Sequence, residues 1–313
     1  MQSRTRSVFP LVPKHRVAGL PFGGVTSLRR GHGSDVAGSR PYVRGDPVST
    51  IDWRASARLS SSRGRDEFVV RERYAEEAAR VVVLCDFGPS MGIYPPTLPW
   101  LSKPVAVRSA VELIVQSALA AHASVAYLDY AGAPERGGAP YWVAPRGRGA
   151  LQQIEERQAT SHPYDAPDNN LASGLSFLAR FRSELSSGTF IFVISDFLVS
   201  GLTDSAVLGA VARRWEVIPV VVQDPTWEQS FPLVGPLILS LAGPAGGERL
   251  EVRISQREAR SRREANARRH RELFQRLSLL GLDPVSVSTT ESALIDRTFL
   301  DWASRRRDLR QRR

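Results

Sequence analysis

Three short apolar runs in the chain each end directly before a polar residue, and they set the expectation for its fold. The runs cover residues 80–85, 189–195 and 215–222. Each is typical of a strand that is buried on both faces of a parallel sheet. Apolar residues recur at helical spacing between these runs, over residues 105–121 and 171–185. Because the predicted strands alternate with helices, we expect a doubly wound, Rossmann-like α/β sheet.

Further elements are predicted before, between and after these runs. Strands are expected at 123–130, 141–144 and 284–288, and helices at 151–157, 204–214, 256–280 and 291–307. The glycines and prolines of residues 231–254 break the α/β rhythm and are compatible with a hairpin. Residues 1–40 are rich in glycine, proline, serine and arginine, which predicts an irregular or extended entry segment, and residues 41–79 contain short strand-like pieces. We therefore divide the chain into a β-rich N-terminal region (1–79), an α/β domain (80–304) and a frayed basic tail (305–313).

Composition narrows the class of protein. The 313 residues are 42% hydrophobic and 24% charged, which is ordinary for a folded globular chain and excludes disorder as the dominant state. Cys85 is the only cysteine, which excludes a disulfide framework and a multi-cysteine zinc site. Its place within a buried run predicts an inert thiol. Since no apolar run reaches the length of about 20 residues that a membrane span needs, and no export signal is visible, we expect a cytoplasmic protein without a membrane span.

The formal net charge of +10 is compatible with several kinds of anionic partner. Much of the charge lies on the predicted helix 256–280. Its arginines are Arg257, Arg260, Arg262, Arg263, Arg268, Arg269, Arg271 and Arg276. A surface that tracks phosphates needs such a stripe, but no aromatic residues alternate with these arginines to stack on bases. We therefore expect no nucleic acid as partner, keep an arginine-driven nucleic-acid binder as an alternative, and consider an acidic protein surface the better fit.

Oxygen-bearing side chains follow two of the predicted buried strands. Asp86 and Asp196 come directly after the first two apolar runs, Ser90 follows soon after Asp86, and a polar turn at 165–170 precedes a predicted helix. Ligands of doubly wound sheets bind outside the carboxyl ends of the strands. Hard divalent cations such as Mg²⁺ prefer oxygen ligands, so the sequence predicts an all-oxygen metal site at this edge. The alternative is that these side chains only cap loops and helices by hydrogen bonds.

The stretch Asp86-Phe-Gly-Pro-Ser90-Met91 resembles the D-x-S-x-S loop of von Willebrand factor A domains, which holds their metal-ion-dependent adhesion site. A more specific match lies upstream, where an ordered set of residues is similar to the signature of the domain-of-unknown-function 58 family. The set comprises Arg40, Tyr42, Gly45, Asp46, Asp52, Trp53 and Arg58, followed by the segment 71–77 and, after the loop, by Lys103. The chain resembles this family over residues 28–300.

The resemblance implies a von Willebrand factor A-like domain in which Asp86, Ser90, Asn169 and Asp196 hold Mg²⁺, directly or through water. Asn169 stands where the family has a threonine, and Gly88 stands where it has the first serine, which leaves room for a water or a partner. Members of the family look like non-enzymatic interaction or scaffold proteins that act with MoxR-type AAA+ ATPases in chaperone-like maturation or metal insertion. The partners implied are therefore such an ATPase and its client protein.

A serine hydrolase is the competing enzymatic interpretation. Gly88-Pro-Ser90-Met-Gly92 fits the G-x-S-x-G nucleophile elbow, and Asp196 and His270 follow in the order of a triad. The prolines at 95, 96 and 99 delay the next helix, however, and His270 lies in the arginine-rich helix and not in a loop at a strand end. The elbow interpretation is therefore disfavoured.

A polar and aromatic cluster in the N-terminal region has two interpretations. It consists of Asp46, Asp52, Trp53 and Arg58. The cluster is either a docking surface or a structural feature in which Arg40 or Arg58 pairs with Asp46 or Asp52. The structural interpretation is favoured, because buried or half-buried charges are usually paired.

Overall fold

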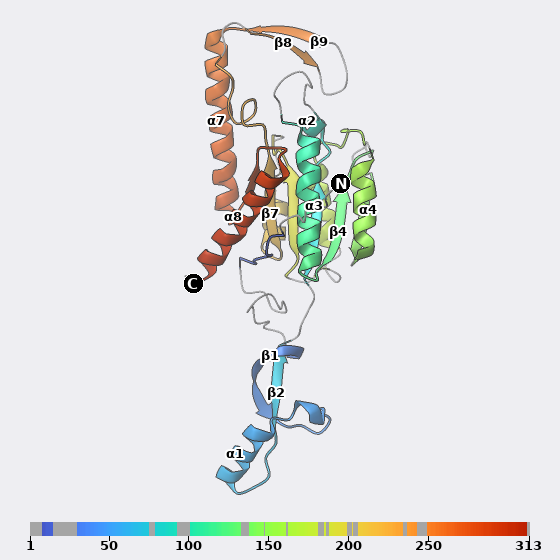
Figure 1. Cartoon of the computed structure of the whole chain (residues 1–313), viewed down its shortest axis with the longest axis vertical. Coiled ribbons are helices and arrows are strands. Elements are labelled where there is room, and N and C mark those ends of the chain that lie inside the picture. The colour runs from blue at the N-terminus through green and yellow to red at the C-terminus, as the bar shows by residue number, and fades with distance from the viewer. Residues whose placement is uncertain are drawn as a thin grey trace. The chain divides into compact units, whose positions relative to one another are not determined.

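The computed structural model describes residues 8–14, 30–74, 79–92, 101–132, 138–146, 148–160, 162–180, 185, 188–198, 202, 206–233, 237–242 and 249–311. The chain forms two compact units. One comprises Met1–Val12 with Arg80–Arg313, and the other comprises Pro13–Ala79. The helices and strands of both units are labelled in Figure 1.

The larger unit is built on a six-stranded sheet with the order β10-β7-β6-β3-β4-β5. Its strands are β3 (Arg80–Cys85), β4 (Ser124–Asp129), β5 (Tyr141–Arg146), β6 (Phe190–Ser195), β7 (Glu216–Val222) and β10 (Val285–Val287). Neighbouring strands are parallel, except that β4 and β5 are antiparallel. The three apolar runs form β3, β6 and β7, which are buried on both faces. This confirms the predicted α/β architecture.

The order of the strands changes direction between β3 and β6. From β3 the chain continues to β4 and β5 at one edge, and then returns to place β6, β7 and β10 on the other side. Cys85 pairs with Ile194 in the β3–β6 register, so the two strands end at the same edge of the sheet. In doubly wound sheets such a switch point, outside the carboxyl ends of the strands, is where ligands bind.

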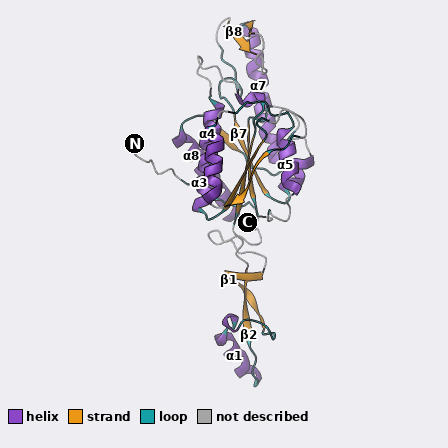
Figure 2. Ribbon diagram, turned by 90° about the vertical axis from the view of Figure 1, so that its right-hand side faces the viewer, coloured by secondary structure: helices purple, strands orange, loops and turns teal. Residues whose placement is uncertain are grey.

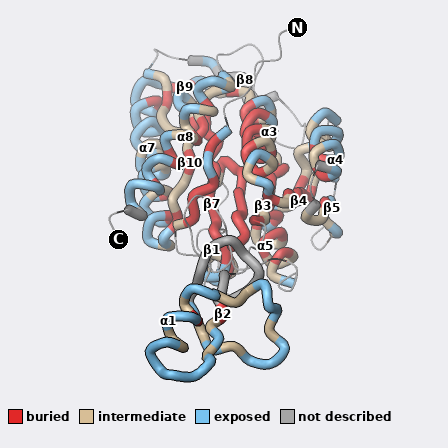
Figure 3. The backbone as a smooth tube through the Cα atoms, turned by 60° about the horizontal axis from the view of Figure 1, so that its bottom comes forward, coloured by how far each residue is buried: buried red, intermediate tan, exposed pale blue. Residues whose placement is uncertain are grey.

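Helices cover both faces of this sheet (Figure 2). One face carries α3 (Lys103–Ala120), α4 (Arg148–Ala159) and α8 (Ser292–Gln311), and the other carries α5 (Asn170–Arg180), which contacts α6 (Ala206–Ala212). Buried residues are concentrated on the strands and on the sides of the helices that face them (Figure 3). Gly174 permits a close approach of α5, because a Cβ there would lie 2.7 Å from Leu84 Cδ1 and 2.9 Å from Leu128 Cδ2.

Three further elements complete the described part of this unit. They are the short helix α2 (Pro89–Gly92), the hairpin of β8 (Leu237–Ala242) and β9 (Arg249–Ile254), and the long helix α7 (Gln256–Leu279). The hairpin is antiparallel, as the sequence predicted, and α7 begins directly after it (Figure 1). A capping box of Ser255 and Glu258 starts α7, with each side chain bonded to the backbone N–H of the other residue.

Phe9, Leu11 and Val12 are buried in the core of the α/β unit, although they precede the N-terminal unit in the sequence. The ring centroid of Phe9 lies 4.9 Å from that of Phe299 and 5.9 Å from that of Trp302. The backbone N–H of Phe9 donates to Ser117 Oγ at 3.1 Å. Phe9 therefore ties the start of the chain to α3 and α8.

The frayed basic tail predicted from residue 305 onward is wrong over the described residues, because α8 continues to Gln311. Arg306 is buried, and its guanidinium donates to Glu216, to Asp283 and to the backbone carbonyl of Val12. Arg306, which the sequence places in a basic tail, therefore forms ion pairs in the interior of the protein.

The smaller unit combines two strands with a helix. Its elements are β1 (Arg30–Pro41), the 3-10 turn η1 (Val48–Thr50), α1 (Trp53–Arg63) and β2 (Val69–Tyr74), which pairs antiparallel with β1. Strand β1 is compatible with the extended alternative predicted for residues 1–40, but α1 was missed, because only strand-like pieces were predicted for residues 41–79. Asp52 starts α1 as its N-cap, where its side chain accepts hydrogen bonds from the N–H groups of Arg54 and Ala55.

Two signature residues form an ion pair inside this unit. Arg40 donates to both carboxylate oxygens of Asp46, at 2.6 and 2.7 Å, and the N–H of Val43 donates to the same carboxylate at 2.9 Å. The structural interpretation of this cluster therefore applies to Arg40 and Asp46. Trp53 remains 60% exposed, with its ring 6.0 Å from that of Phe68, so its interpretation as a docking residue stays a prediction.

We expect the substitution Arg40→Gln to raise the pKa of Asp46 from about 2 toward the usual 3.8. The hydrogen bonds from Arg40, followed by the bond from Val43, keep the pKa at about 2. A lowered carboxyl pKa means that the pair stabilises the unit above the ordinary pKa, and that this stabilisation is lost as the pH falls through about 2. An NMR titration of the Asp46 carboxyl measures the change. The exposed neighbour Arg44, changed to Gln, is the control and should leave the pKa in place.

Candidate functional site at the carboxyl ends of β3 and β6

Asp86 and Asp196 lie at the same edge of the sheet, at the switch point between β3 and β6. The backbone N–H of Asp86 donates to the carbonyl of Ile194 at 2.9 Å, which extends the pairing of the two strands to the site. Both aspartates are buried, with 7% and 1% of their surfaces exposed. Because buried carboxylates need hydrogen bonds or a cation, their surroundings decide what the site can do.

The carboxylate of Asp86 is held by hydrogen bonds and has no ion-pair partner among the described residues. Its Oδ1 accepts from the N–H of Gly88 at 2.7 Å and from Asn170 Nδ2 at 3.0 Å, and its Oδ2 accepts from Ser195 Oγ at 2.6 Å. Burial raises the pKa of Asp86 against the effect of these bonds. A Cβ on Gly88 would lie 3.0 Å from Asp86 Oδ1. Because Gly88 has no side chain, its N–H can form the short hydrogen bond to this oxygen.

Two side-chain oxygens at this edge of the sheet are buried and accept no hydrogen bond from any residue that the structure describes. They are the hydroxyl oxygen of Ser90 in α2 and the amide oxygen of Asn170, the first residue of α5. The amide nitrogen of Asn170 is satisfied, since it donates to Asp86 and to the carbonyl of Pro167, each at 3.0 Å. Its oxygen is therefore left available for a ligand.

Asn169, which the family pattern placed at the metal, is exposed and lies in the turn before α5. It lines a different hollow of about 520 Å³, together with Tyr130, Phe177 and Arg180. The structure brings the next residue, Asn170, to Asp86 instead. In the sequence, Asn170 stands directly before the apolar positions of a predicted helix. As the first residue of α5, it is buried and turns inward.

Asp196 differs from Asp86 because a buried lysine neutralises it. Lys103 Nζ binds Asp196 Oδ2 at 2.7 Å, forms a second ion pair with Glu228 Oε1 and donates to the carbonyl of Ser90 at 3.0 Å. Burial raises the pKa of Glu228, and the charge of Lys103 opposes this. The sequence analysis named Lys103 only as a family match and missed Glu228, which no motif or periodicity marks.

A second set of hydrogen bonds connects this edge of the sheet to α7. Gln223 Nε2 donates to the backbone carbonyl of Asp196 at 2.6 Å, and Gln223 Oε1 lies 2.9 Å from His270 Nδ1. Burial, followed by the charge of Arg269, lowers the pKa of His270. The contact with the His270 ring holds Gln223 in place, and Gln223 in turn binds the start of the loop after β6.

The hydrogen bonds of a Ser90–His270–Asp196 triad are not found among the described residues. Ser90 Oγ has no hydrogen-bond partner, His270 bonds to Gln223, and the carboxylate of Asp196 binds Lys103 and the N–H of Leu198. The prolines at 95, 96 and 99 lie outside the described residues. A nucleophile and its base must lie within hydrogen-bond reach, so this arrangement does not activate Ser90.

The donor set suits a hard cation more than a soft one. Asp86, Ser90 and Asn170 offer carboxylate, hydroxyl and amide oxygens, which are the ligands that Mg²⁺ accepts together with water. Within the described ranges, no group of three or more His, Cys, Asp or Glu side chains could hold a metal ion. A metal at this edge would therefore depend on the uncharged oxygens of Ser90 and Asn170 as well as on Asp86.

Two other expectations concern Cys85 and membrane spans. Cys85 is buried in β3, and this burial raises the pKa of its thiol far above the usual value, which fits an inert core residue. None of the helices in the described part of the chain is long and apolar enough to cross a bilayer.

Known structures resemble this chain only weakly. The pilus adhesin SpaC from Lactobacillus rhamnosus GG is 12% identical with a TM-score of 0.37, and the match covers 74% of this chain and 30% of that chain. The PilB minor pilin from Streptococcus sanguinis is 12% identical with a TM-score of 0.39, and the match covers 78% of this chain and 66% of that chain. Similarity at this level supports no functional inference, and no curated protein matches the chain.

A family model gives a far more specific match. It carries the description "Protein of unknown function DUF58" and matches residues 38–273. The matched range includes the ion-paired signature residues Arg40 and Asp46, the loop from Asp86 to Ser90, and Lys103. Since the match covers most of its length, the chain belongs to the DUF58 family.

Proposed function

We propose that the chain is a non-enzymatic interaction protein whose α/β unit is a von Willebrand factor A-like domain with a modified metal-ion-dependent adhesion site. In this proposal, Mg²⁺ at the edge formed by β3 and β6 attaches an anionic side chain of a partner protein. The partner we propose is a MoxR-type AAA+ ATPase, with which the chain acts in chaperone-like maturation of a client protein. Membership of the DUF58 family supports the choice of this partner.

One observation carries the proposal: among the described residues, a buried carboxylate without a counter-charge and two buried oxygens without hydrogen-bond partners belong to the same edge of the sheet. Asp86 has no ion pair within the described residues, although it is buried, with 7% of its surface exposed. Ser90 Oγ and Asn170 Oδ1 lack hydrogen-bond partners there as well. A buried carboxylate without a counter-charge and a buried oxygen without a hydrogen bond each cost free energy. A divalent cation held by all three groups would compensate this cost.

Asp86, Ser90 and Asn170 are the residues that would hold the metal, directly or through water. When bound, the metal supplies a positive charge with an open position that an incoming carboxylate can fill. Gly88 removes one hydroxyl ligand that the family pattern has, and its missing side chain leaves space for water or the partner. Asp196 is less available to a metal, because its Oδ2 already binds the ammonium of Lys103.

We expect Mg²⁺ or Mn²⁺ to raise the thermal unfolding midpoint of the native chain, and Asp86→Ala and Asn170→Ala to abolish this rise. A metal present at a hundred times its Kd adds about 2.7 kcal/mol to the free energy of unfolding, which a thermal shift assay detects. Asp168→Ala and Asn169→Ala are matched controls, because both residues are exposed in the turn before α5. The controls should keep the rise.

Three outcomes would contradict the metal site: no rise in the native chain, an equal rise in the Asp86→Ala variant, or a loss confined to Asn169→Ala. The last outcome would restore the position given by the family pattern and remove Asn170 from the site. Circular dichroism of each variant without metal checks that the fold is intact.

Binding of the partner is measured separately with a purified MoxR-type AAA+ ATPase. We expect the native chain to retain the ATPase in Mg²⁺, and Asp86→Ala to lose it while Asp168→Ala does not. The variant decides the result, because EDTA would also remove Mg²⁺ from the nucleotide of the ATPase. No retention of the ATPase contradicts the proposed partner, and equal retention by native chain and Asp86→Ala contradicts the metal bridge.

A further inference from the structure

Helix α7 has an inner face that is fixed to the α/β unit. Ala259, Leu273 and Leu277 are buried on this side. Asn266 Nδ2 donates to the backbone carbonyls of Trp227 at 3.0 Å and of Ser230 at 2.6 Å, in the segment that follows β7. These contacts set the rotation of α7 about its axis, so they also determine which residues lie on its outer side.

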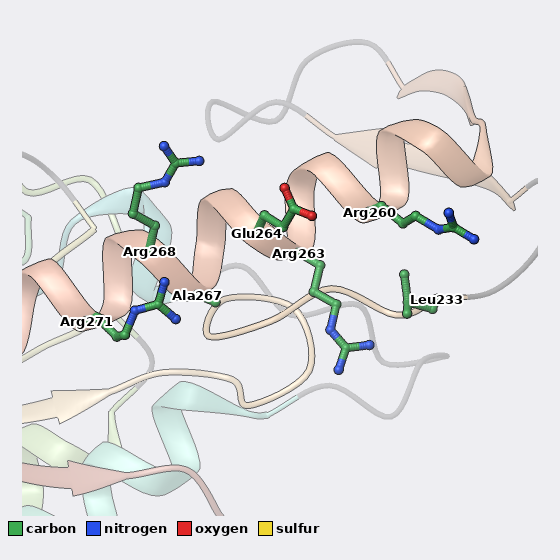
Figure 4. A pocket seen from close by; sticks show the side chains of 7 residues that line it. All are labelled: Leu233, Arg260, Arg263, Glu264, Ala267, Arg268 and Arg271. Atoms are coloured by element: carbon green, nitrogen blue, oxygen red, sulfur yellow. The ribbon is translucent and has the colours of Figure 1, made fainter.

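The outer side of α7 carries four arginines, which together with Glu264 and Ala267 form a surface that we call the basic face. Its members recur at the spacing i, i+3, i+4, i+7, i+8 and i+11, which places them on one side of a helix. They are Arg260, Arg263, Glu264, Ala267, Arg268 and Arg271. With Leu233 they line a hollow of about 540 Å³, and Figure 4 shows Leu233 on the side toward which Arg263 extends.

The charges of the basic face are not neutralised within the described part of the protein. The four arginines are exposed, and none of them forms an ion pair with another described residue. Two pairs of arginines stand three positions apart, a spacing at which like charges weaken an isolated helix. Glu264 is the only acidic residue among the described members of the basic face, so the net charge of this face is strongly positive.

We propose that the basic face binds an acidic segment of a partner protein that also carries an apolar side chain. Guanidinium groups bind carboxylates through paired hydrogen bonds, and four of them are spread over about 17 Å of helix. Ala267 and Leu233, which is 50% exposed, supply an apolar contact among these arginines. A nucleic acid fits less well, because none of the described residues that line the hollow is aromatic and able to stack on a base.

This surface goes beyond the proposed metal site, because it uses none of the residues that would hold the metal. Asp86→Ala should therefore leave binding at the basic face unchanged. The two proposals can therefore fail separately, because Asp86→Ala alters the proposed metal site and the arginine substitutions described below alter the basic face.

The probe is a fluorescein-labelled peptide of glutamate and leucine, and its affinity is measured by fluorescence anisotropy. We expect the change of Arg260, Arg263, Arg268 and Arg271 to Gln to weaken binding by about tenfold or more. Glutamine is a good helix former, so α7 should persist, and circular dichroism checks this. The matched control changes four exposed arginines elsewhere in the same unit to Gln and should alter affinity less than about twofold. These are Arg108, Arg213, Arg305 and Arg307.

Two further arms test the chemistry of the ligand. Leu233→Ser should weaken binding of the glutamate-leucine peptide and leave binding of an all-glutamate peptide unchanged. A single-stranded DNA of equal charge should bind more weakly than the peptide. Equal weakening by the two sets of four substitutions would show a net-charge effect and overturn the proposal. Tighter binding of the DNA through the same four arginines would overturn it in favour of a nucleic-acid surface.

Discussion

Replacing Lys103 with methionine is expected to destabilise the α/β unit by about 3–5 kcal/mol, which is typical when a buried charge loses its partner. The ammonium of Lys103 is buried and binds the carboxylates of Asp196 and Glu228 as well as the carbonyl of Ser90. Without it, two buried carboxylates lie close together with no counter-charge. Methionine keeps a long, unbranched apolar side chain, so most of the loss reports the missing charge. Urea unfolding followed by circular dichroism measures the change.

Two variants separate the effect of charge from that of packing. In the triple variant Lys103→Met, Asp196→Asn and Glu228→Gln no charge of the cluster remains, and we expect much of the lost stability to return, since replacing a whole buried ion cluster is often neutral. Arg108→Met is the control on the same helix, where an exposed arginine should change stability by less than about 0.5 kcal/mol. A triple variant that is no more stable than Lys103→Met would assign the loss to packing around the lysine stem.

Lys103 also explains why the two aspartates of the site are not equivalent. Both follow buried strands, and a sequence pattern treats them alike. The lysine at the start of α3 neutralises Asp196, whereas Asp86 receives only hydrogen bonds from described residues. The edge of the sheet therefore offers one carboxylate to a cation and uses the other to hold α3 and the turn at Glu228 in place.

The central strands could be predicted from the sequence because they are buried on both faces. Such strands are continuous apolar runs, and β3, β6 and β7 begin and end within one or two residues of the predicted limits. Helix α1 could not be predicted from periodicity, because Ser56 is its only buried residue among the described ones and no apolar stripe exists. Only its ends carried signals: the N-cap Asp52 and Gly64, which adopts φ 66° after the last turn.

The placement of the candidate residues could be predicted where they follow strand ends, and could not be predicted where the start of a helix or a distant contact decides. Asp86, Ser90 and Asp196 belong to the first kind. Asn169 and Asn170 belong to the second, since the turn before α5 leaves Asn169 exposed, whereas the first residue of the helix, Asn170, reaches Asp86. Glu228 meets Lys103 only through the fold, so no local pattern could identify it.

The change Arg306→Met is expected to reduce the free energy of unfolding by about 3–5 kcal/mol, comparable to the loss at Lys103. Arg306 Nε donates to Asp283 at 3.1 Å, and its Nη1 donates to the carbonyl of Val12 at 3.1 Å and to Glu216 at 3.3 Å. Its guanidinium also lies over the ring of Trp302, 4.6 Å from the centroid. Urea unfolding measures the loss.

The neighbours of Arg306 provide the decisive comparison, because the same chemical change can be made at an exposed place on the same helix. Arg305→Met and Arg307→Met should each cost less than about 0.5 kcal/mol, since both side chains are exposed. Arg306 also binds Val12, so its loss should speed hydrogen exchange in residues 8–12, far away in the sequence, which neither neighbour should do. If all three variants unfold alike, the last turns of α8 contribute no more than a frayed tail, and the interior role assigned to Arg306 is wrong.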